Sequence, residues 1–257
     1  MPSSALHGFA LLVSACTLYL VAAGVMTHGG LPPESHRLMG IGLMVLSMVE
    51  AGWLLKADPR ISLRLMGGLL VLGMALLAFV TGYPAVHATL SQFVFGLAAS
   101  IAGLTSLQWQ RGPRPVADEG SPSVRTLGWL VPLGVAIQVA LGAGLRYDAL
   151  PVWPHISGSL LVGGLLLFAG MAVMQSYSMH DALRGAGMTL LWVTALQVML
   201  GMAAYGVRVM KHPEPWTVWL TMGHVVTGAL TMGAALMFAF QVFYHVRERL
   251  FVREAAA

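Results

Sequence analysis

Eight long apolar segments cover most of this 257-residue chain and restrict its fold more than any other feature. Glycine, proline or charged residues bound each segment, over the ranges 5–27, 37–55, 62–82, 86–108, 125–147, 153–176, 186–208 and 215–245. A helix needs about 20 apolar residues to cross a bilayer. Only 9% of the residues are charged, against about 25% in a soluble domain. The sequence therefore predicts an all-α integral membrane protein with eight transmembrane helices.

A single long polar connection divides these segments into two sets of four. It contains three prolines and several charged residues, and we place the boundaries of this cytoplasmic linker at 110–124. We expect residues 1–109 to form an N-terminal four-helix bundle and residues 125–257 to form a C-terminal four-helix bundle, with pseudo-symmetry between them.

An internal repeat supports this division. The segment Gln138-Val-Ala-Leu-Gly142 recurs as Gln197-Val-Met-Leu-Gly201, and each copy precedes a polar turn, a proline and a segment that begins near a histidine. In the first half, Gly24 lies 12 residues before His36. In the second half, Gly144 lies 11 residues before His155. The repeat unit is interpreted as a helical hairpin whose second helix presents a histidine.

The distribution of positive charge predicts the orientation in the membrane. With eight helices, both termini share one side with the linker, and that side carries ten lysines and arginines. The other side carries four, which are Arg37, Arg146, Arg208 and Lys211. The positive-inside rule then places both termini in the cytoplasm of a multi-pass protein of the plasma (inner) membrane. The net charge of +4 reflects this orientation, and no nucleic-acid partner is expected because no basic patch is interleaved with aromatic residues.

Four histidines occupy matching places near the starts of the second, fourth, sixth and eighth segments: His36, His87, His155 and His224. An ionisable side chain inside a membrane is unfavourable and usually functional. A four-helix bundle can hold a haem between facing helices, with one imidazole on each side of the iron. We therefore pair His36 with His87 and His155 with His224 as haem-iron ligands near the outer face. The alternative is four satisfied polar residues at the membrane interface.

Charged residues near these histidines suggest further roles. Arginine side chains pair well with carboxylates such as haem propionates, so Arg37, Arg146 and Arg208 are candidate cofactor-binding residues; topology anchoring is the alternative. Glu34 could hold a proton or orient a water beside His36. An equally good interpretation is that Glu34 only stabilises the N-terminus of its helix, where an acidic side chain is favourable.

Other titratable residues are weaker candidates. His7 and His245 lie at the opposite, cytoplasmic ends of their segments, where they could hold a second layer of haem or act as ordinary polar residues. Glu50 lies about 21 Å along the helix from His36, near Lys56, and is not taken as a site residue. Three histidines fall in loops and are expected to be solvated: His28, His180 and His212.

The chain resembles the haem A synthase family over nearly its whole length, about residues 5–246. The segments that carry the resemblance are Glu34-Ser-His36-Arg37, Val86-His87-Ala-Thr-Leu, Pro154-His155-Ile-Ser-Gly and Gly223-His224-Val-Val-Thr-Gly, with the two Gln-Val-x-Leu-Gly segments. The resemblance implies oxidation of the C8 methyl of haem O to the formyl group of haem A. It implies that His155 and His224 hold a haem b that relays electrons, and that His36, His87 and Glu34 form the catalytic site.

Three differences from the family all lie in the first half. The acid lies two residues before His36, where the family places it three before. The arginine-containing, glycine-rich sequence usual at the end of the first helix is replaced by AAGVMTHGGLPP, and the cysteine pair of some members is absent. A second hypothesis is therefore a non-catalytic haem b electron-transfer subunit of a respiratory membrane complex. A third is a haem-free structural or assembly subunit. The expected partners are membrane lipid and haem, with haem O synthase or a respiratory complex as further candidates.

Overall fold

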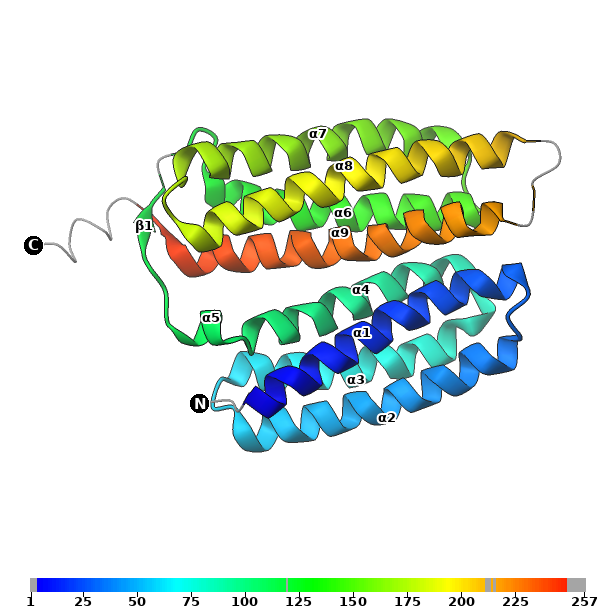
Figure 1. Ribbon diagram of the computed structural model, residues 1–257, viewed down its shortest axis with the longest axis horizontal. Coiled ribbons are helices and arrows are strands. Elements are labelled where there is room, and N and C mark those ends of the chain that lie inside the picture. Colours follow the sequence, from blue (N-terminus) through cyan, green and yellow to red (C-terminus); the bar gives the residue numbers. More distant parts are fainter. Residues whose placement is uncertain (1–3, 119, 211–213, 215, 249–257) are drawn as a thin grey trace, which may run out of the picture. The chain divides into compact units, whose positions relative to one another are not determined.

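The computed structural model describes residues 4–118, 120–210, 214 and 216–248, and most of them are helical (Figure 1). Eight helices are long and apolar enough to cross a membrane: α1 Ser4–Met26, α2 Pro33–Ala57, α3 Ile61–Phe79 with its continuation η2 Val80–Gly82, α4 Pro84–Leu104, α6 Val124–Arg146, α7 Val152–Ser176, α8 Asp181–Val209 and α9 Thr217–His245. The short elements are η1 Thr27–Gly29, α5 Leu107–Gln110, β1 Val116–Ala117 and β2 Val246–Arg247. The prediction of an all-α membrane protein with eight spans is confirmed.

Prolines position the first turns that carry the histidines. Pro33 and Pro84 are the first residues of α2 and α4, where the missing N–H has no partner inside the helix anyway. Pro151 lies one position earlier, as the residue that precedes the first residue of α7. As a result His36 and His87 are each the fourth residue of their helix, as is the histidine of α7. His224 is the eighth residue of α9, about one turn deeper from the start of its helix.

The chain forms two compact units, and the first comprises Met1–Arg111 with Met199–Gly233. Helices α1–α4 form a closed ring in which α1 packs on α2 and α4, and α3 packs on the same two helices. Helices α2 and α4 therefore lie diagonally across the ring. A core of Val21, Phe95 and Ala229 packs the first half of α9 against α1 and α4.

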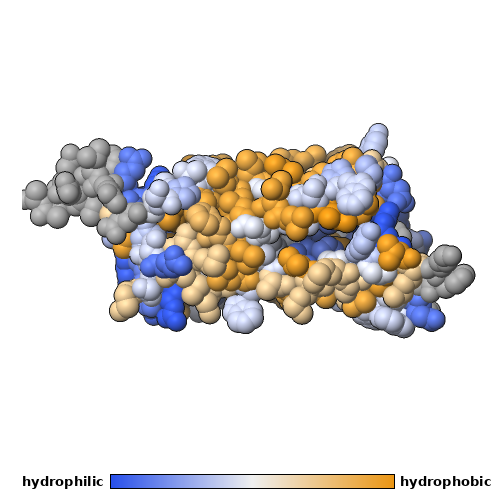
Figure 2. Space-filling view, turned by 90° about the horizontal axis from the view of Figure 1, so that it is seen from above, coloured by the Kyte–Doolittle hydropathy of each residue, from blue (hydrophilic) through white to orange (hydrophobic). Residues whose placement is uncertain are grey.

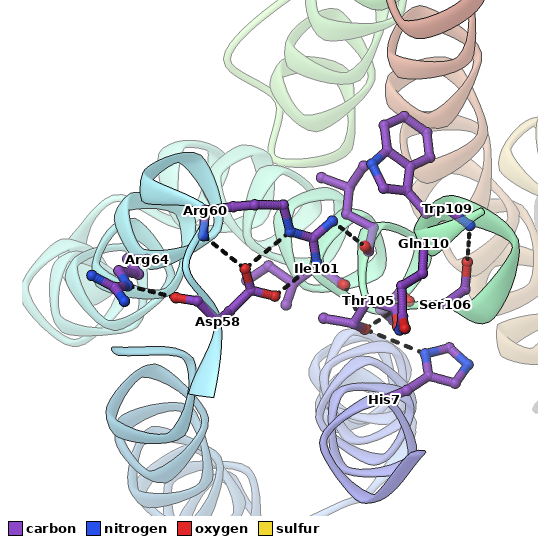
Figure 3. Close-up of polar contacts among 11 residues, drawn as sticks. His7, Asp58, Arg60, Arg64, Ile101, Thr105, Ser106, Trp109 and Gln110 are labelled. Atoms are coloured by element: carbon purple, nitrogen blue, oxygen red, sulfur yellow. Dashed lines mark hydrogen bonds and ion pairs between the residues drawn. The ribbon is translucent and has the colours of Figure 1, made fainter. Parts of the chain in front are cut away.

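A polar network closes the end of the first unit that holds the N-terminus of α1 (Figure 3). The Asp58 carboxylate is fully buried and accepts hydrogen bonds from Arg60 at Nε (2.9 Å), Nη2 (2.7 Å) and the backbone N–H (2.9 Å). Arg60 also donates to the carbonyl of Leu104 (3.0 Å), and Arg64 donates to the carbonyl of Asp58 (2.6 Å). The network joins the α2–α3 turn to the end of α4 and satisfies carbonyls that the helix ends leave without partners.

The Asp58 network predicts an acid-sensitive stability. Burial raises the pKa of the Asp58 carboxyl, but the hydrogen bonds and charge of Arg60, with the charge of Arg64, lower it further than burial raises it. A carboxyl whose pKa is lower in the folded state than in the unfolded state stabilises the fold at pH values above its unfolded pKa of about 4. This contribution is lost as the pH falls from there through the lower folded-state pKa. We expect Asp58→Asn to lower the free energy of unfolding by about 2 kcal/mol at neutral pH, with a smaller difference from wild type below about pH 4. Thermal unfolding in detergent, measured from neutral pH to below about pH 4, gives both the loss of stability in Asp58→Asn and its dependence on pH.

Asp181→Asn is the matched control for Asp58→Asn. Its carboxylate lies 3.9 Å from the Arg114 guanidinium, and both side chains are exposed. Exposed pairs of this kind contribute little to stability, so this variant should unfold like wild type at every pH. Equal unfolding of Asp58→Asn and wild type at neutral pH would contradict a stabilising role for the network.

The second unit comprises Gly112–Val198 with Ala234–Ala257, and glycines set its helix contacts. Helix α6 packs along α7. A Cβ added at Gly170 of α7 would lie 3.0 Å from the carbonyl oxygen of Gly187 of α8, and one added at Gly187 would lie 2.9 Å from that of Gly170. A Cβ added at Gly128 of α6 would lie 3.1 Å from Cζ of Phe243 of α9. Small residues allow this close approach of helix backbones, as is usual in membranes where no hydrophobic effect drives helices together.

The connection before α6 folds back onto the end of α9. Strand β1 pairs in parallel with β2, so that Val116 lies opposite Val246. Asp118 then caps α6, because its carboxylate accepts hydrogen bonds from the Ser123 hydroxyl and from the backbone N–H groups of Val124 (3.1 Å) and Arg125 (3.3 Å). Burial raises the pKa of Asp118, but these hydrogen bonds lower it by more. The carboxylate therefore stays ionised at the positive end of the α6 dipole.

Apolar side chains cover the outward faces of the helices, as lipid contact requires. Figure 2 shows apolar residues along the middle of the helices on the face in view, with hydrophilic residues near the helix ends. Exposed large side chains include Phe79, Leu160, Leu161 and Trp192. The predicted contact with membrane lipid fits this surface. Three residues used in the predicted charge asymmetry lie outside the described residues: Lys211, Arg249 and Arg253.

Candidate haem-ligand site

The structure brings His36 of α2 and His87 of α4 together across the ring of the first unit. Their ring centroids are 6.2 Å apart and the ring planes are inclined at 64°. Two imidazoles bound to opposite sides of one metal ion have ring centres about 6 Å apart, because each metal–nitrogen bond is about 2 Å long. The predicted approach of this pair is thus found at a separation that fits a single metal centre.

The hydrogen bond made by Nδ1 of His87 leaves Nε2 of the same ring suited to metal binding. Nδ1 of His87 lies 3.1 Å from the backbone carbonyl oxygen of Leu77 in α3. A carbonyl oxygen only accepts, so Nδ1 carries the proton and Nε2 of the neutral ring has a free lone pair. Metal-ligating histidines commonly donate their other N–H to a backbone carbonyl in this way.

His36 is held by contact with a glycine rather than by a hydrogen bond. Its Nδ1 is buried without a hydrogen-bond partner among the described residues. Its Cε1 lies 3.2 Å from where a Cβ of Gly24 in α1 would be. An alanine at position 24 would therefore force the ring to move.

The same contact between a glycine and an imidazole occurs in two other hairpins. A Cβ at Gly142 of α6 would lie 2.9 Å from Cε1 of His155, and one at Gly201 of α8 would lie 3.0 Å from Cε1 of His224. We call these glycines the cradle glycines: Gly24, Gly142 and Gly201. The expected equivalence of Gly144 with Gly24 is wrong, because Gly144 packs on Leu150 instead. The interpretation of the repeat as a helical hairpin that presents a histidine is consistent with these three contacts.

His155 has a side-chain partner as well as a cradle glycine. Nε2 of Gln138 lies 3.0 Å from Nδ1 of His155 and donates to its backbone carbonyl at 2.9 Å. The amide oxygen of Gln138 is buried without a hydrogen-bond partner among the described residues and fits over Gly158 of α7. His155 belongs to the second unit and His224 to the first, so the pairing of these two histidines stays a prediction.

The predicted charged residues around the histidines lie near helix ends. Glu34 and Arg37 are exposed in the first turns of α2. A spacing of two residues rotates Glu34 by about 200° around the helix from His36, so their side chains leave the helix in different directions. The Arg146 guanidinium lies over the ring of Tyr147 at 5.6 Å. Arg208 is exposed near the end of α8. Propionate binding by these arginines stays a prediction.

The expectation that His180 is solvated is wrong. His180 is buried and its ring centroid lies 4.5 Å from that of His245. Nε2 of His180 lies 3.1 Å from the carbonyl oxygen of Arg114, while Nδ1 of His245 accepts from the N–H of Arg114 at 3.0 Å. The two histidines thus fix the connection before α6, which the sequence did not indicate because the contact uses backbone groups.

Three other histidines are less informative. His7 lies 3.3 Å from the hydroxyl of Thr105 at the end of the first unit shown in Figure 3. His28 lies in η1. His212 lies outside the described residues.

Glu50 is a buried carboxyl, although Lys56 lies only six residues further along the sequence. It is fully buried in α2, and neither carboxyl oxygen has a hydrogen-bond partner among the described residues. The adjacent Ala51 and Leu54 pack against Gly67 of α3, whereas Lys56 is exposed. A buried polar group without a partner destabilises the folded state by about 1–3 kcal/mol.

Replacing Glu50 by methionine is expected to stabilise the protein by about 1–3 kcal/mol, because it removes this unpartnered group at similar volume. The measurement is the thermal midpoint in detergent. Gln110→Met is the control, because its amide donates to the carbonyl of Thr105 at 2.9 Å and its loss should give no gain. A Glu50→Met protein less stable than wild type would show that the carboxyl has a favourable partner.

Sequence reasoning missed two contacts at the candidate site histidines. The sequence could not indicate the contact of His87 with the Leu77 carbonyl, because every residue has a backbone carbonyl. Gln138 did leave a signal, since it begins a repeated segment, but the repeat alone did not indicate that its amide touches His155. Comparison with known proteins adds no further assignment: no protein-family model matches the sequence, and no curated protein matches it.

Proposed function

We propose that this chain is a haem-binding membrane oxidoreductase of the haem A synthase type, which oxidises the C8 methyl of haem O to a formyl group. The observation that carries the proposal is the approach of His36 and His87 to 6.2 Å from diagonal helices, with Nδ1 of His87 on a backbone carbonyl. The donor set fits haem, because a neutral imidazole is a common ligand of haem iron and His36 and His87 would supply two. Bound haem supplies an iron centre that exchanges single electrons.

Each pair of histidines has its own role in this proposal. His36 and His87 would hold or face the substrate haem, with Glu34 as the acid of this site. His155 and His224 would hold haem b, with Arg37, Arg146 and Arg208 near the propionates. Both termini would lie in the cytoplasm and the four histidines near the outer face.

A second candidate is a haem b electron-transfer subunit without synthase activity. The exposed position of Glu34 favours it, because an acid on a different side of α2 from His36 is poorly placed to act on a haem bound there. The separation of His36 and His87 also suits two histidines that would both hold one haem.

One experiment separates these candidates. The protein is produced in membranes with and without a haem O synthase, purified in detergent, and its pigments are extracted and identified by mass. Haem A or its alcohol intermediate supports the synthase, and haem b alone supports the electron-transfer subunit. A protein that stays colourless when haem is supplied would overturn both.

A further inference from the structure

We propose that the outward face of α2, near its C-terminal end, is a binding site for one anionic phospholipid. An acyl chain would lie in a groove over Gly52, and the phosphate would lie beside Lys56. Gly52 is about 24 Å along the helix from His36. The site is therefore separate from the histidines, and its failure would leave the proposed haem function untouched.

A groove of about 370 Å³ follows two turns of α2, and it is lined by Val49, Gly52, Trp53 and Lys56. Residues three, four and seven positions apart lie on one face of a helix, so the groove runs along this face. Gly52 leaves room for it, because a Cβ added there would meet no atom within 4 Å. The volume falls in the range of about 300–1,000 Å³ that is usual for small-ligand sites.

The walls of the groove suit an acyl chain. The ring of Trp53 lies against Phe9 of α1, with ring centroids 5.8 Å apart and ring planes inclined at 47°, and Val49 is half exposed. An apolar wall without a neighbour loses van der Waals contacts, which a chain in the groove would restore. Tryptophan is enriched where a membrane meets water, and Trp53 lies one turn before the end of α2.

Lys56 places a positive charge at the end of this groove. Its side chain is exposed in the last turn of α2, and it forms no ion pair with a carboxylate among the described residues. Asp58 does not neutralise it, because this buried carboxylate is bound to Arg60 at 2.7 Å. Residues 56–64 carry three cations and one carboxylate. The turn after α2 therefore has an excess of positive charge, which attracts an anionic headgroup.

The groove and the charge together favour an anionic phospholipid over other occupants. The stem of Lys56 can line the groove while its ammonium group reaches the aqueous interface, where the lipid phosphate lies. A zwitterionic lipid would fill the groove equally well but would leave the excess charge of the turn in place. A second copy of this chain, related by two-fold symmetry, would bring the same cations together, and like charges at an interface are unfavourable.

The test measures the fluorescence of Trp53 in vesicles of phosphatidylcholine and phosphatidylglycerol, with bromine on the acyl chains of one lipid or the other. Bromine quenches a tryptophan that touches the chain, and subtraction of the Trp53→Phe spectrum isolates the signal of Trp53. We expect phosphatidylglycerol to bind about fivefold more tightly than phosphatidylcholine, as one lysine near anionic lipid gives. Lys56→Arg should keep this preference, whereas Lys56→Gln or high salt should remove most of it.

Two glycine variants of α2 test the groove itself. Gly52→Leu should fill the groove and reduce quenching by both lipids, with no loss of thermal stability, because the added side chain meets open space. Gly42→Leu is the matched control, since a Cβ there also meets nothing within 4 Å, and it should quench like wild type. The lysine variants change only an exposed side chain, so the test does not depend on the folding of Gly52→Leu.

Three results would overturn the proposal. Equal binding of the two lipids by wild type would show ordinary lipid contact only. An equal preference in Lys56→Gln and wild type would show that this lysine does not select the headgroup. Weak quenching by both lipids, together with dimers captured by cross-linking, would show that a second copy covers this face.

Discussion

The haem proposed to bind between α2 and α4 is expected to be lost when His87 is replaced by alanine, and equally when His36 is replaced. The centroids of these two rings lie 6.2 Å apart. Nδ1 of His87 donates its proton to the Leu77 carbonyl, so Nε2 keeps a lone pair that can bind a metal. Losing a hydrogen-bond partner of a ligating histidine already costs about 10–100-fold in metal affinity, so losing the ligand should exceed about 100-fold. The measurement is haem per protein, from the pyridine haemochrome spectrum of protein purified in detergent.

Two further variants make this result specific. His7→Ala removes a half-buried histidine at the opposite end of the same unit, where Nδ1 of the ring lies 3.3 Å from the hydroxyl of Thr105, and it should keep the wild-type haem content. In His87→Gly, added imidazole should restore the low-spin spectrum by occupying the vacated space. Full wild-type haem content in both His36→Ala and His87→Ala would rule out these residues as ligands. If a second haem is bound through His155, it should remain in both variants.

The positions of the helices and the depth of the histidines follow from local sequence. Apolar runs of membrane-spanning length define the eight helices, because only a helix satisfies its own backbone in lipid. Prolines define the starts of α2 and α4, which places His36 and His87 at the same helical position. These features need no knowledge of neighbouring helices. The local sequence is therefore enough to predict that these two histidines lie at matching positions in their helices.

The contacts that hold the rings depend on rotation between neighbouring helices, which the sequence leaves open. Matching glycines by the number of residues before the histidine selects Gly144, whereas in the structure Gly142 contacts the ring of His155. A shift of two residues turns a side chain by about 200° around the helix. The turn between α6 and α7 contains Asp148 with φ of 54°. Because the path of such a turn is not evident from the sequence, the number of residues between a glycine and a histidine does not show which glycine faces the imidazole. Glu50 shows the same limit, since its burial depends on which face of α2 meets α3.

Substitution of Gly142 by alanine is expected to lower haem retention by about 10–100-fold. The added Cβ would lie 2.9 Å from Cε1 of His155, whereas carbon atoms in contact settle at about 3.5–4.0 Å. The ring must therefore retreat by about 0.6–1 Å, beyond the roughly 0.5 Å within which a ligand site works. Gln138 restrains the direction of that movement, because it bonds both Nδ1 and the backbone carbonyl of His155. Gly142→Leu should abolish haem binding through His155.

Gly163→Ala in α7 is the matched control, because a Cβ there would meet nothing within 4 Å. Alanine is favoured over glycine in helices by about 1 kcal/mol, so this variant should be as stable as wild type or more so, with unchanged haem content. Both variants are compared by haem per protein and by the rate of haem transfer to an excess of apomyoglobin. Equal transfer rates for Gly142→Ala and Gly163→Ala would show that the cradle glycine does not position the ring. Faster transfer from Gly142→Ala alone, with equal thermal stability, would show that the contact acts on the ligand rather than on the fold.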